Sequence, residues 1–497
     1  MPDSRPKNIL FITADQMRWD CLGCVGNEII KTPTLDAIAR RGVLFRNGFS
    51  PDPICVPARA TMMTGNYPQV CTGEKRNSGR IKDGQPLLSS VLQSVGYRTY
   101  AKGKLHFVPY QPPGKPRLVH GLENVELTES GRMIRQFDPT GATPGIEDYF
   151  DYLKEVGWCG YARAHGIGNN DIRPCASPLP KEHYVDHWIA DRVIAEVDAH
   201  LAASADTPFF MWMSSPKPHS PYDPPRPFDN LYDPRLIPAP AGSPELLHGR
   251  YAGIDRVRHT HAAVDISPEA WRVIRSYYYG NITFLDEMIG RVLSHLEEKG
   301  VLDDTLILFT ADHGDLLGDF GSVFKSNHLN GAVRVPFIVC GPGVEAGRVS
   351  DALVGLQDIL PTFASFAGAD VGADVHGVDL MPHLGDASAD VRDVYYATTR
   401  GLGQTAMVTD GRFKYIYAEA NATEELYDQI ADPGELVNLA VDGGKEELRA
   451  RMREMLIACA REFDDAELLD GDDLAKTEVD TSEFAKLPIG GMGWRWY

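Results

Sequence analysis

The sequence predicts an α/β fold: a large, doubly wound, mostly parallel sheet sandwiched by helices, followed by a smaller C-terminal α+β subdomain with an antiparallel sheet. Two observations lead to this prediction. Nearly continuous apolar, β-branched runs alternate with helical stretches, and this alternation stops near residue 390. We expect the larger domain over residues 1–385 and the subdomain with its tail over residues 386–497.

The apolar runs are typical of strands buried on both faces, as in a parallel sheet. Helical stretches lie between them: TPTLDAIARRG begins with a Thr-Pro start signal and ends at Gly42, and two longer stretches begin at His183 and Ser267. Catalytic groups of such sheets lie at the carboxyl ends of the strands. The predicted strands cover residues 8–15, 97–105, 208–215, 305–312 and 335–343.

Outside this regular pattern, residues 109–180 and 216–265 are rich in Pro, Gly, His and Asp. Insertions of that length commonly shape substrate sites, and we expect them over the sheet edge without regular structure. After residue 390, the segments VYYATTRG, TAMVTDG and RFKYIYA indicate an antiparallel meander, with a helix near 445–463. The tail ends in GMGWRWY, whose aromatic residues are a candidate contact within a homo-oligomer.

Composition narrows the class of partner. The 497 residues include 49 Lys and Arg against 69 Asp and Glu, a net charge of −20, which argues against binding to nucleic acid or an anionic membrane. The 8 cysteines are scattered, no apolar run is long enough for a spanning helix, and no signal peptide is apparent. We therefore expect a cytoplasmic protein, in which an anionic substrate would need a local cluster of cations.

Two carboxylates end two predicted strands in the same manner, Asp15 in FITAD and Asp312 in LFTAD. Gln16 adds an amide oxygen beside the first and His313 an imidazole beside the second. The resulting set of three oxygens and one nitrogen suits one divalent cation. From spacing alone, the two aspartates could equally be turn formers at strand ends.

A group of cationic or titratable side chains falls at strand ends or in loops expected on the same edge. In GKLHF, Lys104 and His106 are two residues apart, so on a strand they would share a face. Taken singly, each member has a structural explanation, but together they indicate an anion site in an acidic protein. The group comprises Arg59, Lys104, His106, His219 and Lys325.

The stretch PDPICVPARATMMTG places a lone cysteine, Cys55, between Pro53 and Pro57 and four residues before Arg59. The prolines fix φ and remove N–H donors, which keeps the segment from pairing as a strand. We expect a helix from Ala58 onward, whose N-terminus would favour an anion.

CVPAR resembles the C-x-P-x-R signature of the type I sulfatases, in the alkaline-phosphatase-like superfamily. The resemblance covers about residues 8–440, and ordered matches make it specific. The further matching segments are FITADQ, GYRTYAKGKLHF, PHSPY, FTADHGDLLGD, FKSNHLNGAVRVPFIV and LYDQIADPGELVNLA.

The resemblance implies that a formylglycine-generating enzyme oxidises Cys55 to formylglycine, an aldehyde. Its hydrate would attack the sulfur of a small-molecule sulfate ester. His219 would donate the leaving-group proton, and His106 would take a proton from the hydrate so that sulfate is eliminated.

The remaining roles implied by the resemblance concern charge. Arg59 and Lys104 would stabilise the hydrate, while Lys325 and the metal would hold the sulfate oxygens. Asn77 and His328 are candidate substrate-binding residues, although His328 could equally cap a turn.

Two departures from the sulfatase pattern keep alternatives open. Gln16 replaces a second aspartate and His313 replaces an asparagine, which weakens the case for calcium alone. Calcium remains the expected cation, and the nitrogen ligand admits manganese. The related phosphonate monoester hydrolases share both residues, whereas the Lys and His of GKLHF fit the sulfatases. The alternatives are a phosphonate monoester or phosphodiester hydrolase with the same nucleophile, and a non-catalytic anion-binding protein with an unmodified Cys55.

Overall fold

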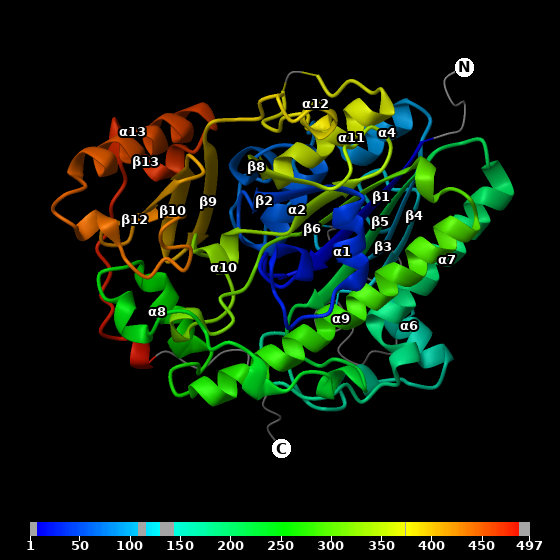
Figure 1. Cartoon of the computed structure of the whole chain (residues 1–497), viewed down its shortest axis with the longest axis horizontal. Helices are drawn as coiled ribbons and strands as arrows, with labels where there is room; N and C mark the ends of the chain where they lie inside the picture. The colour runs from blue at the N-terminus through cyan, green and yellow to red at the C-terminus, as the bar shows by residue number, and fades with distance from the viewer. Residues whose placement is uncertain (1–6, 108–115, 130–143, 373, 487–497) are drawn as a thin grey trace.

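The computed structural model describes residues 7–107, 116–129, 144–372 and 374–486. Its centre is an eight-stranded sheet in the order β4-β3-β5-β1-β6-β7-β2-β8, flanked on one side by a separate four-stranded sheet (Figure 1). Every pairing in the large sheet is parallel except those of β7 with β6 and β2. The strands are β1 Asn8–Asp15, β2 Gly42–Phe49, β3 Arg98–Gly103, β4 Asn124–Leu127, β5 Phe209–Pro218, β6 Thr305–Ala311, β7 Phe337–Cys340 and β8 Arg348–Gly355.

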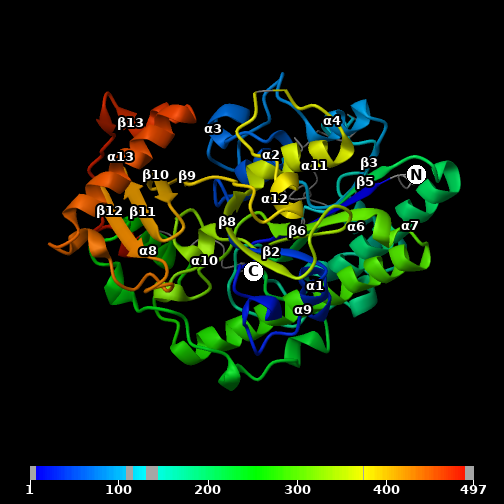
Figure 2. The same ribbon diagram turned by 45° about the horizontal axis from the view of Figure 1, so that its top comes forward.

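Helices cover both faces of the large sheet, which confirms the predicted fold class. All residues of β1, β5 and β6 are buried, as expected for apolar strands between two helical layers. One layer contains α1 Pro33–Arg40, α7 Val185–Ser204 and α9 Pro268–Glu298 (Figure 2). The other contains α2 Cys55–Thr64, α4 Leu88–Ser94, α11 Ile359–Ala367 and α12 Met381–Gly385.

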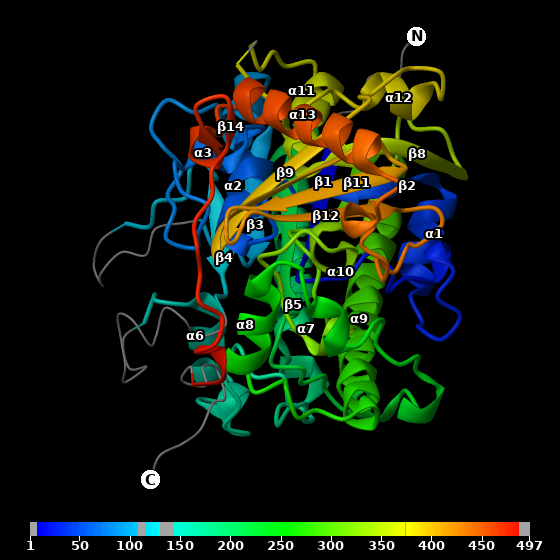
Figure 3. The same ribbon diagram turned by 90° about the vertical axis from the view of Figure 1, so that its left-hand side faces the viewer.

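The C-terminal part forms the predicted antiparallel meander, with strand order β12-β11-β10-β9. Helix α13, Glu446–Glu462, packs across one face of this second sheet (Figure 3). The strands are β9 Tyr395–Gly401, β10 Gly403–Thr409, β11 Phe413–Ala418 and β12 Thr423–Asp428. The aromatic end of the tail lies outside the described residues, so the predicted oligomer contact stays a prediction.

The second sheet contacts the loop that precedes Cys55. The amide of Thr398 in β9 donates to the carbonyl of Pro51 (2.9 Å), and the amide of Ser326 donates to the carbonyl of Pro53 (3.1 Å). Thr398 and Ser326 are both far in the sequence from the loop that they contact. The C-terminal meander therefore helps to position the start of α2.

The structure corrects several sequence-based expectations. Strands β2, β4 and β8 were not predicted, and the segments expected to be irregular contain β4, helix α6 Asp148–Glu155 and helix α8 Ala252–Thr260. Strand β4 is short and β8 is an edge strand, whereas β2 lies between β7 and β8 and carries Arg46, Asn47 and Gly48 within its apolar run. In the described part of the chain, no helix combines the length and apolar character needed to span a bilayer.

Candidate active site

The carboxyl ends of β1, β3, β5 and β6 bring the predicted residues to one edge of the large sheet. Asp15 is the last residue of β1, and Asp312 directly follows β6, its neighbour in the sheet. Lys104 follows β3, and His219 follows β5. The strand order thus brings residues that are far apart in the sequence into one cluster, as expected for this type of sheet.

Cys55 lies at the first turn of α2, which begins three residues earlier than the predicted start at Ala58. Pro57 is tolerated there because the first turn of a helix does not need its missing N–H donor. The Cys55 Sγ atom is 3.2 Å from Nε2 of His313 and 3.8 Å from Oδ1 of Asp15. Asn77 holds the helix start, accepting a hydrogen bond from the amide of Val56 (3.0 Å).

The surrounding cations favour negative charge at this point. Burial alone would raise the pKa of Asp15, but Lys104 and His219 in particular hold it well below its usual value. Burial likewise opposes ionisation of the Cys55 thiol, yet Lys325 and Lys104 bring its pKa down to about 7. The lysines of the cluster therefore favour the ionised forms of Asp15 and Cys55 in an acidic protein.

Four donor groups are arranged as a metal site. One ligand atom each from Asp15, Cys55, Asp312 and His313 lies within 4.8 Å of the others, and all four residues are buried. Nδ1 of His313 is 2.9 Å from the carbonyl of Gly314, which leaves Nε2 directed at the two carboxylates. An imidazole fixed through its other nitrogen is the usual arrangement of a metal ligand. These residues fit the implied divalent cation.

Protonation of His313 would compete with such a cation. Burial opposes the charged imidazole, but the carboxylate of Asp312 outweighs it and raises the pKa of His313. Since a bound metal requires the neutral ring, metal affinity should increase as His313 loses its proton.

Arg59 lies behind this cluster rather than on its open side. Its Nε donates to Asp312 Oδ2 (2.8 Å), and its Nη1 donates to the carbonyl of Lys104 (2.7 Å) and to Ser214 Oγ (2.9 Å). The side chain is fully buried. In this structure, Arg59 therefore orients Asp312 and the Lys104 backbone.

Lys104 and His106 do not share a strand face as expected, because β3 ends at Gly103. Gly103 has φ of 110°, and a Cβ atom there would lie 1.9 Å from the carbonyl oxygen of Ser214, so the turn requires glycine. Lys104 nevertheless pairs with Asp15, and His106, with φ of 60°, reaches the same site.

His219 and Lys325 meet on the open side. Nδ1 of His219 is 2.8 Å from the carbonyl of Ser220, and Nε2 is 3.0 Å from Nζ of Lys325. Lys325 also donates to the amide oxygen of Gln16, whose Nε2 donates to Asp315 Oδ2 (2.8 Å). The Gln16 oxygen thus lies next to the cluster but is engaged by a lysine, and its role as a metal ligand stays a prediction.

Cys55 opens into a cavity of about 360 Å³. The predicted residues on its lining are Cys55, Asn77, His106, His219 and Lys325. Five residues that were not among the predicted site residues also line it: Asn170, Val257, His261, Phe324 and Ser326. The only signal for Asn170, Val257 and His261 was their position in the two insertions expected to shape a substrate site.

His328 does not line this cavity. It is buried, and its carbonyl accepts a hydrogen bond from Lys414 Nζ in the second sheet (2.7 Å). Burial lowers the pKa of His328 to about 3, so the ring is neutral. Neither ring nitrogen has a hydrogen-bond partner among the described residues, so a turn-capping role is not seen and substrate binding by His328 stays a prediction.

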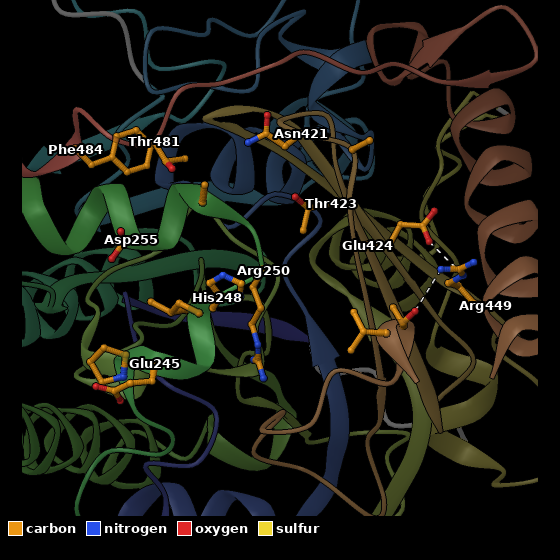
Figure 4. A pocket seen from close by; sticks show the side chains of 17 residues that line it. Glu245, His248, Arg250, Asp255, Asn421, Thr423, Glu424, Arg449, Thr481 and Phe484 are labelled. Atoms are coloured by element: carbon orange, nitrogen blue, oxygen red, sulfur yellow. Dashed lines mark hydrogen bonds and ion pairs between the residues drawn. The ribbon is translucent and has the colours of Figure 1, made fainter. Parts of the chain in front are cut away.

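A second and larger cavity, of about 890 Å³, lies between α8 and the second sheet. Among its polar groups, Arg449 contacts Glu424 (3.4 Å) and the carbonyl of Ala440 (3.2 Å), as the dashed lines of Figure 4 mark. Arg250 donates to the carbonyl of Glu435 (2.8 Å). None of the predicted reactive residues lines this space, so we assign the candidate active site to the smaller cavity.

Comparison with known proteins identifies the family. The model of the Sulfatase family matches residues 7–369, and that of the N-sulphoglucosamine sulphohydrolase C-terminal region matches residues 318–462. The chain belongs to the sulfatase family. This confirms the resemblance inferred from CVPAR and the ordered segments around it.

Individual relatives agree with this sulfatase assignment. The chain is 30% identical to an arylsulfatase of Clostridium perfringens, covering 90% of this chain and 93% of the relative. It is also 30% identical to a choline-sulfatase of Rhizobium meliloti, covering 87% and 82%. Among solved structures, the phosphonate monoester hydrolase of Agrobacterium radiobacter superposes with a TM-score of 0.76 at 26% identity, covering 92% of this chain and 96% of that one.

Asp52 lies three residues before Cys55 of this sulfatase and contacts the second sheet. It is fully buried, Oδ1 accepts a hydrogen bond from Thr399 Oγ1 (2.6 Å), and Oδ2 has no hydrogen-bond partner among the described residues. Burial raises the pKa of Asp52 to about 8. The folded protein therefore retains a proton here that the unfolded chain releases near pH 4.

This shift predicts a pH-dependent stability. Because the folded-state pKa is raised, the stabilisation is fully present below about pH 4 and is lost as the pH rises through about 8. Asp52→Asn should remove this loss. The Tm of the variant should therefore rise relative to the Tm of the wild type as the pH increases from about 5 to about 8. Thermal melts across this range test the prediction, with the exposed Asp206→Asn as control. Parallel pH profiles of wild type and Asp52→Asn would contradict it.

Proposed function

We propose that this protein hydrolyses sulfate esters. The observation that carries the proposal is the position of Cys55 at the start of α2, within reach of Asp15 and His313 and facing a cavity lined by His106, His219 and Lys325. Membership of the sulfatase family and the similarity to an arylsulfatase and a choline-sulfatase support the same reaction.

We further propose that Cys55 is matured to formylglycine by a formylglycine-generating enzyme, and that one divalent cation binds Asp15, Asp312 and His313, with Gln16 beside them. Calcium is the expected ion and manganese the second. Together the hydrated aldehyde and the cation would supply an oxygen nucleophile at neutral pH and charge to hold a sulfate oxygen. The donor cluster and its positive surroundings support this assignment.

The remaining residues act on the substrate and on protons. Lys325, on the cavity, would place positive charge where the sulfate oxygens gain negative charge in the transition state, and Lys104, paired with Asp15, would stabilise the hydrate. His219 is oriented by the Ser220 carbonyl through Nδ1, and its Nε2 is next to Lys325. To act as the general acid it would have to be the imidazolium, whose Nε2–H would pass its proton to the departing alcohol oxygen as the S–O bond breaks. His106 would accept the proton released when sulfate leaves, and Asn77 fixes the helix start.

A phosphonate monoester or phosphodiester hydrolase is the second candidate. Gln16 and His313 favour it, as does the fold similarity to the hydrolase of Agrobacterium radiobacter. Both substrate types have a tetrahedral centre with a single negative charge, so one site can bind either. Lys104 and His106 favour the sulfatase reaction.

The ratio of the two activities distinguishes these candidates. We expect kcat/KM for 4-nitrophenyl sulfate to exceed that for 4-nitrophenyl phenylphosphonate by about tenfold or more, because the site presents Lys104 and His106. Both substrates release the same phenol, so one assay at one wavelength measures both rates. A preference for the phosphonate by orders of magnitude would make the second candidate the better description.

A non-catalytic anion-binding protein is the alternative of another class. It predicts an unmodified Cys55 in protein isolated from its native host, which peptide mass spectrometry measures. We also propose a cytoplasmic location, on the basis of the sequence expectations, and a homo-oligomer formed through the C-terminal tail.

A further inference from the structure

Besides Ser326, four described residues line the cavity with Cys55 and have no part in the chemistry proposed above: Asn170, Val257, His261 and Phe324. We call them the alcohol-side wall. Since Lys325 and the Cys55 cluster would bind the sulfate, these four side chains would contact the alcohol part of the ester. They therefore bear on which alcohol the enzyme accepts, a question the sequence left open.

The wall is held in place by contacts outside the reacting groups. The His261 ring packs edge-on against Phe324, with ring centroids 4.7 Å apart and an interplanar angle of 86°. Arg173 donates to the carbonyls of His261 (3.2 Å) and Ala262 (2.8 Å), and thereby fixes the end of α8. Arg258 of α8 donates to the carbonyl of Gly321 (3.2 Å), which ties the helix to the loop that carries Phe324.

The wall offers hydrogen bonding but no charge. Burial lowers the pKa of His261 to about 4, so its imidazole is neutral at physiological pH. Its Nδ1 is buried and has no hydrogen-bond partner within the described residues. No carboxylate is found among the described residues that line the cavity, and the ammonium of Lys325, which also lines it, is assigned to the sulfate.

We propose that the alcohol-side wall selects the sulfate ester of an uncharged, single-ring aryl alcohol, whose polar substituent is hydrogen-bonded by His261. Val257 and Phe324 supply an apolar surface for the ring. A cavity of about 360 Å³ is at the small end for ligand sites, which fits one ring. A cationic or anionic alcohol would be desolvated here without a counter-charge. This inference rests on the proposed function and names the substrate class of that same site.

A matched pair of substrates tests the charge preference. The sulfate esters of 4-hydroxybenzamide and 4-hydroxybenzoate have nearly the same size and differ in one negative charge. We expect kcat/KM for the amide to exceed that for the carboxylate by about tenfold or more, and choline sulfate to be slower than the amide. Equal rates, or faster hydrolysis of either charged ester, would overturn the proposal.

A variant tests the role of His261 as a specificity-determining residue. His261→Phe keeps a ring beside Phe324 but removes the hydrogen bond, so KM for the benzamide ester should rise about threefold to tenfold while phenyl sulfate changes little. His248→Phe makes the same exchange at an exposed histidine of the second cavity (Figure 4) and should leave both substrates unaffected. An unchanged benzamide-to-phenyl ratio in His261→Phe would overturn this role.

The wild-type substrate pair keeps the proposal testable even if His261→Phe does not fold. Hydrolysis of sulfate esters without a preference for the uncharged one overturns this inference and leaves the proposed function intact. Failure of matured, metal-loaded protein to hydrolyse any of these sulfate esters overturns both.

Discussion

Cys55→Ala should reduce kcat for sulfate-ester hydrolysis by about a thousandfold or more, because it removes the only precursor of the proposed nucleophile. The methyl group of alanine fits the space of the thiol, and α2 keeps its start, so the folded structure should persist. Steady-state kinetics and circular dichroism of the purified variant measure the two effects.

Cys71→Ala is the matched control for this substitution. Cys71 is also buried, in the short helix α3 Pro68–Cys71, and does not line the candidate active site. Its loss should lower stability slightly and leave kcat within about twofold. Turnover by Cys55→Ala at a rate near that of the wild type would exclude Cys55 as the nucleophile.

Asp312→Asn should remove both metal binding and activity, with kcat/KM falling by about a hundredfold to a thousandfold. The carboxylate accepts hydrogen bonds from the amides of Gln16 and His313 (3.0 Å each) and pairs with Arg59 (2.8 Å). An amide cannot neutralise both a cation and the buried guanidinium. Metal content by mass spectrometry and kcat/KM before and after calcium or manganese addition test this.

Asp319→Asn provides a comparison at a buried aspartate outside the metal cluster. Asp319 pairs with Arg18 (2.7 Å) and Arg275 (2.6 Å), so its substitution should lower Tm while the bound metal is retained. If Asp312→Asn binds as much metal as the wild type, Asp312 is not a ligand and the proposed cation site is wrong.

The reactive edge of the sheet could be predicted from the sequence because a polar residue that follows a buried apolar run marks the end of a strand. Asp15 closes β1 at the predicted residue, and Asp312 follows β6 in the neighbouring position. The family signature added Cys55, His219 and Lys325, which share one cavity. Local pattern and motif were sufficient here because both depend on residues close together in the chain.

What the sequence did not reveal depends on long-range packing. His261 and Phe324 meet only because α8 packs on the loop after β6, and nothing in either segment encodes that contact. The direction of Arg59 likewise follows from the placement of β3 and β6, and the buried His328 is held through its carbonyl by Lys414 of the second sheet. A motif gives the identity of such residues but not their partners.

The hydrogen bonds from Thr398 and Ser326 to the loop before Cys55 also have a consequence for biosynthesis. Both donors are synthesised long after Cys55, so these two hydrogen bonds cannot form until most of the chain has been made. In the folded protein, Cys55 is 1% exposed and part of a helix, so it is not accessible as an extended segment to a modifying enzyme. Chemical maturation of this residue would therefore be expected before the C-terminal meander closes over the segment, while the chain is still unfolded here.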